Sequence, residues 1–295
     1  MVSRYTAKEG HAMLQLTREI LDLIDRALAE DLAAQDPTTT ALVPPDQQGQ
    51  AIVLAKAQGI LAGVDVARAV FARVEPFLET GALLQDGVPL NPGDHIARIQ
   101  GPISGILRAE RTALNFLQRM SGIATETARY VRAVQGLHVR IVDTRKTVPG
   151  HRYLDKYAVR IGGGHNHRLN LADGILIKDN HIAALRAEGL TLGDAVRRAL
   201  EHAPHTLRVE VEVESVKEAR EALEAGAHIL LLDNMNLEDM REAVALAGGQ
   251  ALTEASGGIN LETVRAVAET GVALISVGAL THSAAALDIS LELQV

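Results

Sequence analysis

Arg145 and Lys146 follow directly after a short apolar run, in the segment TRKTVPGHR (residues 144–152). Neighbouring side chains on an extended chain point to opposite sides, so this pair could contact two different anionic groups. An Arg guanidinium suits bidentate binding of a carboxylate or a phosphate. Taken alone, however, the segment is explained more simply as a surface loop that turns at Pro149 and Gly150.

A second concentration of basic side chains lies in GGGHNHR (residues 162–168), where three glycines precede His165, His167 and Arg168. Glycines allow the backbone to turn tightly or to approach a ligand closely. The His-x-His spacing also occurs in metal sites. Because Arg168 would repel a cation and no third ligand is obvious nearby, the segment favours anion recognition.

Carboxylates and a further lysine follow. Lys178 ends the apolar run in ILIKDNH (residues 175–181), and VEVEVE (residues 209–214) alternates strictly, so its glutamates share one face of a strand. Inside a barrel these carboxylates would need a partner, which Lys178 or a metal-bound phosphate would supply. The alternation alone leaves open whether Glu210 or Glu212 faces a site.

Two glycine-rich turns occur late in the chain, in ASGGI (residues 255–259) and SVGALTHS (residues 276–283). We predict that each leads directly into a helix, the first of which begins near Asn260. Backbone N–H groups at such helix starts bind phosphate, and the last strands of a barrel commonly hold one.

The elements that must position these residues alternate regularly in the second half of the chain. Helical runs, such as residues 215–226 and 261–271, separate strand candidates. This alternation predicts an α/β fold with a parallel sheet, either an incomplete barrel or, as the second choice, a doubly wound open sheet. The strand candidates are residues 140–143, 174–178, 207–213, 228–233, 251–255 and 273–277.

Every one of these strand candidates ends in charged, polar or glycine residues. Barrel active sites lie at the carboxyl ends of the strands, where side chains from separate strands converge. A single polar ending would be ordinary loop solvation, but an unbroken series predicts a site. The endings are Arg145-Lys146, Lys178, Glu210 and Glu212, Asp233-Asn234, Ser256-Gly257-Gly258 and Gly278.

The first half of the chain is less regular. The patterns predict an amphipathic helix at residues 14–32, a loop at 36–40, a strand-turn-strand at 51–63 and a helix at 64–74. Short strands and turns at residues 89–105 precede a long helix at 106–134, with an interruption expected near Ser121-Gly122.

Composition narrows the class of protein. The 295 residues suit a large α/β domain with a smaller companion, and the absence of Cys excludes disulfides, thiolate catalysis and Cys-ligated zinc. A net charge of −8 argues against nucleic-acid binding, and no apolar run or signal-peptide core indicates a membrane partner. We therefore expect a cytoplasmic enzyme. Residues 138–181 nevertheless hold eight Lys or Arg against four Asp, which fits an anionic small ligand or a solvated helix face.

These residues resemble the quinolinate phosphoribosyltransferase family over nearly the whole chain. The likeness begins with ALAEDLAAQDPTTT (residues 27–40), GILAGVDVARAVF (59–71) and ERTALNFLQRMSGIAT (110–125), and continues through TRKTVPG, KYAVRIGGGHNHR, IKDNH, VEVE, LLDNM, SGGI and SVGALTHS. It implies an N-terminal α/β sandwich (residues 1–118, with the tail 283–295 packed on it) and a C-terminal incomplete, TIM-like α/β barrel (119–282). It also implies a homodimer with shared sites, which could assemble further.

The resemblance implies transfer of phosphoribosyl from phosphoribosyl pyrophosphate (PRPP) to quinolinate with loss of CO2, which gives nicotinate mononucleotide in NAD synthesis. Quinolinate would meet Arg145, Lys146, His167, Arg168 and Lys178, together with Arg111 from the partner protomer. Lys146, Glu212 and Asp233 would face the ribose and the Mg²⁺ pyrophosphate, with Glu212 chosen over Glu210 by its spacing to Asp233. Ser256, Gly257, Gly278 and His282 would hold the 5′-phosphate. Lys146, Lys178, Glu212 and Asp233 would be the catalytic set.

Three rivals remain to be separated. A related paralogue associated with molybdenum transport shares the fold, but IKDNH and the intact set of cations favour the quinolinate enzyme. A nicotinate transferase that does not decarboxylate should need fewer cations, because nicotinate has one carboxylate. A non-catalytic sensor of phosphate ligands would not need Glu212 and Asp233 beside the cations.

Overall fold

The computed structural model describes residues 14–294, which form two compact units. The first unit contains the chain up to Thr125 together with Tyr153–Gly162 and the end of the chain from Ala285. The second contains Glu126–Arg152 and Gly163–Ala284. Contacts thus divide the chain after Thr125 and before Ala285, where the resemblance implied divisions at 118/119 and 282/283.

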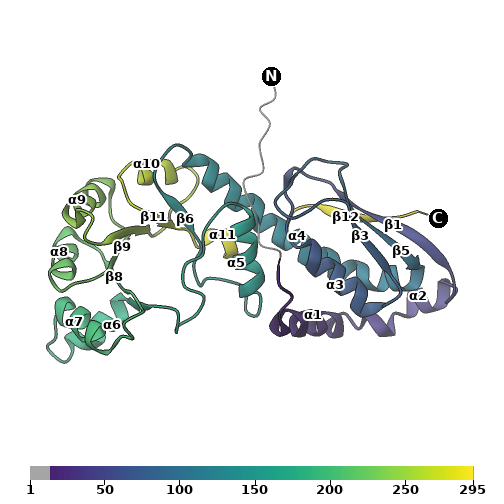
Figure 1. The fold of residues 1–295 in the computed structure, drawn as a ribbon, viewed down its shortest axis with the longest axis horizontal. Coiled ribbons are helices and arrows are strands. Elements are labelled where there is room, and N and C mark those ends of the chain that lie inside the picture. Colours follow the sequence, from purple (N-terminus) through teal and green to yellow (C-terminus); the bar gives the residue numbers. More distant parts are fainter. Residues whose placement is uncertain (1–13, 295) are drawn as a thin grey trace, which may run out of the picture. The chain divides into compact units, whose positions relative to one another are not determined.

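The first unit is built on an antiparallel sheet of four strands, ordered β12-β1-β5-β3 (Figure 1). Its core consists mainly of aliphatic side chains, among them the buried Ile24, Ile52, Val70 and Ile99. The strands are β1 (Gln48–Ala55), β3 (Glu79–Ala82), β5 (His95–Pro102) and β12 (Ile289–Gln294), and β2 (Gly59–Ile60) pairs separately with β4 (Pro89–Leu90). The helices are α1 (Arg18–Glu30), α2 (Pro37–Leu42), α3 (Val64–Val74), α4 (Ile103–Ala133) and α5 (Arg152–Ile161), with a 3₁₀ turn at Ala33–Gln35.

Two expectations for the first half of the chain are wrong. The segment expected as a loop at residues 36–40 forms α2, because Pro37 occupies its first position and the Asp36 carboxylate accepts from the N–H groups of Thr38 and Thr39. The interruption expected near Ser121-Gly122 is absent, since α4 runs unbroken for 31 residues. Gly122 there provides space for the backbone of Ala285.

Helix α5 follows the first barrel strand in sequence, yet most of it belongs to the first unit. The Asp155 carboxylate is fully buried and receives two hydrogen bonds from the Arg119 guanidinium, of 3.0 and 2.8 Å. The Tyr157 hydroxyl donates to Asp86 at 2.8 Å, and burial raises the pKa of that carboxyl. These polar contacts hold α5 to the first unit.

The second unit is a parallel sheet of six strands in the order β6-β11-β10-β9-β8-β7. From β7 to β11 each strand pairs with the next along the chain, and β11 then pairs with β6, the first strand of the unit. In a doubly wound sheet, the order in which the strands are added reverses in the middle of the sheet. The cyclic order seen here instead identifies a barrel, one that lacks the pairing between β6 and β7. The strands are β6 (Arg140–Val142), β7 (Ile175–Ile177), β8 (Val209–Val213), β9 (Ile229–Asp233), β10 (Leu252–Ser256) and β11 (Leu274–Ser276).

Helices surround this sheet on its outer side, as Figure 1 shows. They are α6 (Asp179–Arg186), α7 (Leu192–His202), α8 (Val216–Glu224), α9 (Leu237–Ala247), α10 (Val264–Ala268) and α11 (Ala279–His282). The helix expected near Asn260 begins only at Val264, because the Asn260 side chain accepts from the N–H groups of Glu262 and Thr263 and holds a turn there.

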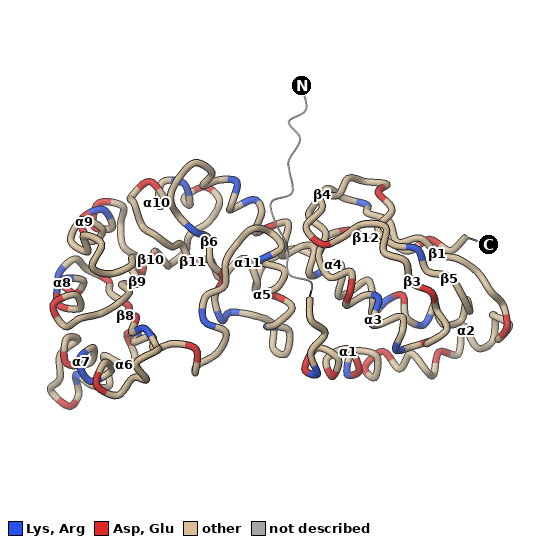
Figure 2. Tube along the Cα trace, in the orientation of Figure 1, with Lys and Arg blue, Asp and Glu red and all other residues tan. Residues whose placement is uncertain are grey.

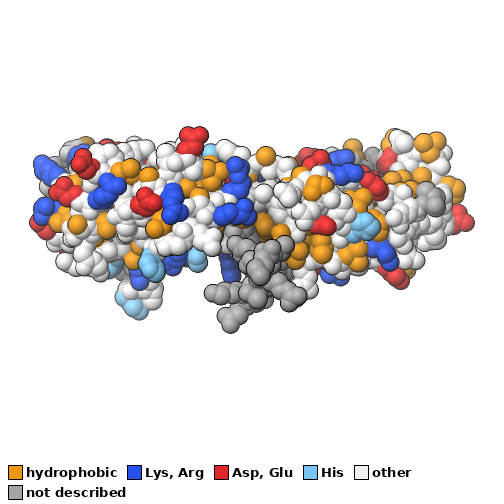
Figure 3. Space-filling model, turned by 90° about the horizontal axis from the view of Figure 1, so that it is seen from above, with side chains coloured by type: hydrophobic (Ala, Val, Ile, Leu, Met, Phe, Trp, Pro, Cys, Tyr) orange, Lys and Arg blue, Asp and Glu red, His pale blue; other side chains and the backbone are white. Residues whose placement is uncertain are grey.

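Basic and acidic side chains are interspersed over the outside of the second unit (Figure 3). Such mixing is typical of a solvated surface. None of the helices within residues 14–294 is both long and apolar enough to cross a bilayer.

Candidate functional site

The carboxyl ends of the barrel strands gather most of the predicted site residues in the second unit. Lys146 lies after β6, Lys178 after β7, Glu212 on β8 and Asp233 at the end of β9. The cations come from β6, from β7 and from the segment between them, which flank the unpaired side of the barrel. The carboxylates and glycine turns come from the continuously paired strands. The site is therefore divided into a basic side and an acidic, glycine-rich side.

Lys146 connects these two sides. The hydroxyl of Thr281 donates to the backbone oxygen of Lys146 at 2.9 Å, which ties the segment after β6 to helix α11. A Cβ added to Gly278 would lie 3.0 Å from Cδ of Lys146 and 3.2 Å from the His282 ring. The absence of a side chain at Gly278 thus lets the lysine stem and the imidazole approach the predicted phosphate turn together.

The segment GGGHNHR is held against β6 by backbone bonds. His165 forms a parallel bridge with Val142, and its N–H and C=O bond Ile141 and Asp143 at 2.8 and 3.0 Å. Two residues further on, the N–H of His167 donates to the buried Asp143 carboxylate at 2.9 Å. This register brings Arg168 to the mouth of the barrel, while the His167 ring faces Glu210 deeper inside.

Two guanidinium groups lie close together there. Burial and the charge of Arg145 lower the pKa of Arg168, and Glu210 partly opposes the shift. The Nε atom of Arg145 is buried and has no hydrogen-bond partner among residues 14–294. Arg168 donates to the backbone oxygen of Gly174 at 3.0 Å, which fixes it beside the segment leading into β7. An incoming anion would relieve the repulsion and satisfy the orphaned donor.

Lys178 and Glu212 form an ion pair of 3.0 Å between the ends of β7 and β8. Figure 2 shows basic and acidic segments side by side where β8 and α6 meet. Of the two alternating glutamates, Glu212 lies nearer the mouth, whereas Glu210 is deeper and only 5% exposed. Lys178, the partner predicted for the carboxylates of this strand, therefore pairs with Glu212.

Asp233 and the turn after β10 are coupled through Asn234, which the sequence marks only as part of a polar strand ending, with no role of its own. Its side-chain amide donates to the Asp233 carboxylate at 2.6 Å, and its backbone N–H donates to Ser256 at 3.1 Å. Asn234 has a positive φ of 53°, and a Cβ on Gly257 would overlap its amide. Gly257 thus provides the space that lets Asn234 orient Asp233.

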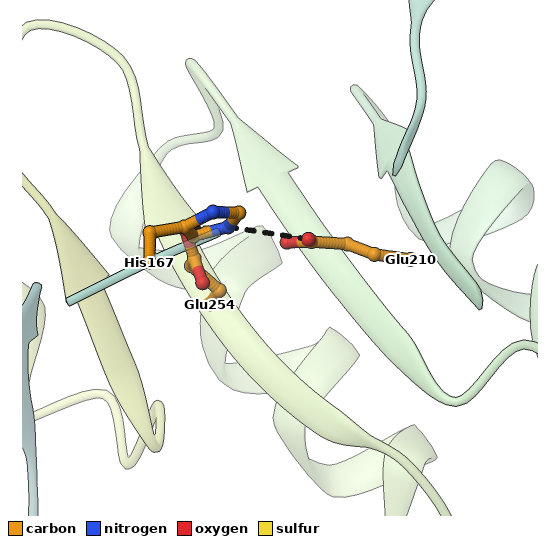
Figure 4. Close-up of side chains that lie close together, drawn as sticks. All are labelled: His167, Glu210 and Glu254. Atoms are coloured by element: carbon orange, nitrogen blue, oxygen red, sulfur yellow. Dashed lines mark ion pairs between the residues drawn. The ribbon is translucent and has the colours of Figure 1, made fainter. Parts of the chain in front are cut away.

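A buried cluster of His167, Glu210 and Glu254 lies deeper in the barrel (Figure 4). Nε2 of His167 is 3.2 Å from Glu210 and 3.6 Å from Glu254. Burial, followed by the charge of Glu210, raises the pKa of Glu254 to about 7, although His167 opposes the shift. Sequence reasoning missed Glu254, but a signal existed, since it is a lone carboxylate inside the strand LTEAS.

Arg111 is the one predicted site residue outside the second unit. It is exposed on the part of α4 that belongs to the first unit, and it forms no ion pair within residues 14–294. Arg152, which sequence reasoning also missed, donates to the Thr147 hydroxyl and to the Leu169 carbonyl, and so joins the two basic loops.

Comparison with known proteins agrees with this arrangement. Residues 36–121 and 123–292 match the families described as the N-terminal and C-terminal domains of quinolinate phosphoribosyl transferase. The chain is 41% identical over 274 residues to a "probable nicotinate-nucleotide pyrophosphorylase [carboxylating]" of Bacillus subtilis, covering 93% of each protein. It is 42% identical over 293 residues to a mitochondrial "quinolinate phosphoribosyltransferase [decarboxylating] 2" of Nicotiana glauca, covering 94% of this chain and 83% of that protein.

Among solved structures, NadC from Streptococcus pyogenes superposes with a TM-score of 0.91 at 40% identity. The match covers 96% of this chain and 99% of that one. Fold, strand-end chemistry and sequence thus agree over both units, and the chain belongs to the quinolinate phosphoribosyltransferase family.

Proposed function

We propose that this protein transfers the phosphoribosyl group of PRPP to quinolinate and releases pyrophosphate and CO2, leaving nicotinate mononucleotide. The observation that carries the proposal is that Arg145 repels Arg168, and Lys178 pairs with Glu212, at the carboxyl ends of strands that also carry carboxylates. Quinolinate presents two adjacent carboxylates, which these cations could bind separately. The alternative functions have less support. Nicotinate has a single carboxylate, and neither it nor a phosphate ligand alone would occupy all three cations.

On the acceptor side, Arg145 and Arg168 would clamp one carboxylate, because their mutual repulsion and the orphaned Nε of Arg145 favour an anion. Lys178 would orient the other. With the ring held in this way, its nitrogen attacks the anomeric carbon while the bond to pyrophosphate breaks. The nitrogen becomes positively charged, and the carboxylate on the adjacent carbon then leaves as CO2. The electron pair of the broken carbon–carbon bond stays on that ring carbon, beside the positive nitrogen, and takes up a proton from water to give nicotinate mononucleotide. Fixed charges, rather than a nucleophilic side chain, would supply most of the rate enhancement.

On the donor side, we propose that Ser256, Gly257, Gly278 and His282 hold the 5′-phosphate. Lys146 supports this assignment, since its stem passes Gly278 beside His282. Backbone N–H groups in such turns suit phosphate oxygens. Lys146 would therefore bridge the donor and the acceptor.

Glu212 and Asp233 have the chemistry to hold Mg²⁺, which prefers carboxylate and phosphate oxygens. One oxygen of Glu212 pairs with Lys178, and one oxygen of Asp233 accepts from Asn234. The second oxygen of each carboxylate would bind a metal or its water. When bound with PRPP, Mg²⁺ would neutralise the departing pyrophosphate.

We also propose a homodimer in which Arg111 of one protomer reaches its partner's quinolinate site. The exposed guanidinium of Arg111, without an ion pair among the described residues, supports this role. A cytoplasmic location stays a prediction that cell fractionation would test.

The deciding experiment incubates the protein with PRPP and Mg²⁺ in parallel with quinolinate, with nicotinate and without a pyridine. Chromatography of the nucleotide products distinguishes the alternatives. We expect nicotinate mononucleotide from quinolinate and little or none from nicotinate. Product from nicotinate alone would instead identify a non-decarboxylating transferase, and no product in any arm would favour a binding protein.

A further inference from the structure

Glu210 and Glu254, which lie against His167, have no role in the proposed reaction. The three side chains come from the segment after β6, from β8 and from β10, which are alternate strands of the barrel. Inward-facing residues of alternate strands form one layer of a barrel interior, usually an apolar one. Here the layer contains two carboxylates that are 5% and 1% exposed (Glu210 and Glu254). Buried carboxylates are costly unless they are hydrogen-bonded, so this layer requires an explanation.

The hydrogen bonds of His167 determine where its proton lies. The backbone N–H of Arg168 donates to Nδ1 of His167 at 2.8 Å. An amide N–H can only donate, so Nδ1 accepts and carries no hydrogen. The neutral ring therefore holds its hydrogen on Nε2, which faces Glu210 at 3.2 Å and Glu254 at 3.6 Å. As a result, both ring nitrogens face groups of the protein itself.

This tautomer also decides against a metal at the cluster, although the three side chains are close enough together to hold one. A metal on Nε2 would require the ring hydrogen to lie on Nδ1. There it would oppose the N–H of Arg168. The geometry thus favours a hydrogen-bonded cluster over a cation site.

We infer that Glu254 is a positioning residue for quinolinate binding: packed beside Glu210 and His167, it keeps the Glu210 carboxylate against the Nε2–H of His167, and the ring in turn fixes the backbone of Arg168. Arg168 is bonded at its backbone to His167 and at its guanidinium to Gly174, so its direction depends on both anchors. This inference rests on the proposed function, because Arg168 is the group that would meet the substrate.

The orphaned oxygens support a proton on Glu254. The Oε1 atoms of Glu210 and Glu254 are buried without a hydrogen-bond partner among residues 14–294. Two charged carboxylates so close together would repel. The groups facing Glu254 are Glu210 on β8, His167, Asp143 after β6 and the Ser276 hydroxyl on β11, and burial raises the pKa of Glu254 to about 7. A neutral Glu254 would leave Glu210 as the charged acceptor for His167.

Two variants at this position separate positioning from simple filling of space. Glu254→Gln keeps the size and a polar group beside Glu210, whereas Glu254→Leu removes the polar group. Glu242→Leu, which changes an exposed glutamate on the outer helix α9, is the matched control. For Glu254→Leu we expect the quinolinate Kd and KM to rise about tenfold or more, with the KM for PRPP changed less than about twofold. Glu254→Gln should stay within about threefold of the unchanged protein, as should Glu242→Leu.

The state of His167 is measured independently, by ¹⁵N NMR of histidine-labelled protein at pH 8 with His167→Gln for assignment. We expect the Nε2–H tautomer in the unchanged protein and in Glu254→Gln, and a mixture of tautomers in Glu254→Leu. The Nδ1–H tautomer in the unchanged protein, an unaltered quinolinate Kd in Glu254→Leu, or one equivalent of bound zinc would each overturn the inference. If Glu254→Leu does not fold, the NMR of the unchanged protein still decides. Failure of the unchanged protein to bind quinolinate would refute the proposed function instead, while leaving the tautomer measurable.

Discussion

The ammonium of Lys178 lies 3.0 Å from the carboxylate of Glu212, and their side chains are 48% and 10% exposed. The lysine ends β7, on the basic side of the barrel, and the glutamate belongs to β8, on the acidic side. One ion pair therefore joins the group proposed to orient quinolinate to the group proposed to face PRPP and Mg²⁺. Its partial exposure makes it a weak contributor to stability, so its value lies in positioning charge.

Replacing Lys178 with Met should lower kcat/KM for quinolinate by about 100-fold or more, because a fixed charge is lost at the reacting carboxylates. Steady-state kinetics with each substrate varied in turn would measure this. Arg186→Ala is the control, since Arg186 on the following helix forms a comparable ion pair of 3.3 Å with Glu218. Equal losses in the two variants would mean that Lys178 acts only through folding.

Mixing Arg111→Ala with Lys178→Ala should restore part of the activity that each variant lacks. If protomers share sites, some sites in a mixed dimer receive both an intact Arg111 and an intact Lys178. Activity is assayed after co-refolding, with mixed dimers demonstrated by two affinity tags. Mixed dimers without recovered activity would contradict a shared site.

Glu254→Gln should change the dependence of stability on pH. The pKa of Glu254 is raised from 4.5 to about 7, mainly by burial. Between these values the folded protein binds more protons than the unfolded chain, so stability falls as the pH rises through this window. The size of the shift limits this loss in the free energy of unfolding to roughly 3 kcal/mol.

Glutamine does not titrate, so the variant lacks this loss of stability. The Tm of the variant minus the Tm of the unchanged protein should therefore be larger at pH 8 than at pH 5. Scanning calorimetry at both values is the measurement. A Tm difference that stays constant with pH would show that Glu254 does not titrate in this window.

Asn234→Gly and Asn234→Ala should affect the donor side selectively. Glycine accepts the positive φ of Asn234 but loses the amide that holds Asp233. We expect Asn234→Gly to raise the KM for PRPP several-fold with near-normal stability, and Asn234→Ala to lose about a further 1 kcal/mol through backbone strain. A larger effect on the KM for quinolinate than for PRPP would argue against this role for Asn234.

Gly122→Ala should destabilise the first unit by about 2 kcal/mol or more, because the added methyl would overlap the backbone oxygen of Ala285. Gly81→Ala is the control, since its Cβ would meet only the oxygen of Arg98, at 3.9 Å. Urea denaturation of both variants compares them. Similar midpoints would contradict the close packing of Ala285 on α4.

The barrel was predictable because its strands are short β-branched runs that alternate with helices, and each strand candidate lies within about two residues of an observed strand. The elements that failed depend on tertiary contacts. Ser121 and Gly122 were expected to interrupt α4, but the Ser121 hydroxyl bonds Ala62 and Gly122 admits Ala285, so both are used in packing. The placement of α5 with the first unit depends on Asp155 and Tyr157, whose partners lie far away in sequence.

The mouth of the site was likewise predictable from strand endings, since parallel strands bring their carboxyl ends to one edge. The interior layer was not. Glu254 is one carboxylate in a strand, and only the barrel's closure brings it to His167. Asn234 is another such case, because its role depends on a positive φ that the residue type permits without requiring.

The most direct test of the account is release of CO2 from quinolinate labelled in the carboxylate next to the ring nitrogen. The account predicts labelled CO2 in one-to-one ratio with nicotinate mononucleotide, only when PRPP and Mg²⁺ are both present, and its loss in Lys178→Met. A protein that binds quinolinate and PRPP yet releases no labelled CO2, or that forms a nucleotide with the label retained, would contradict it.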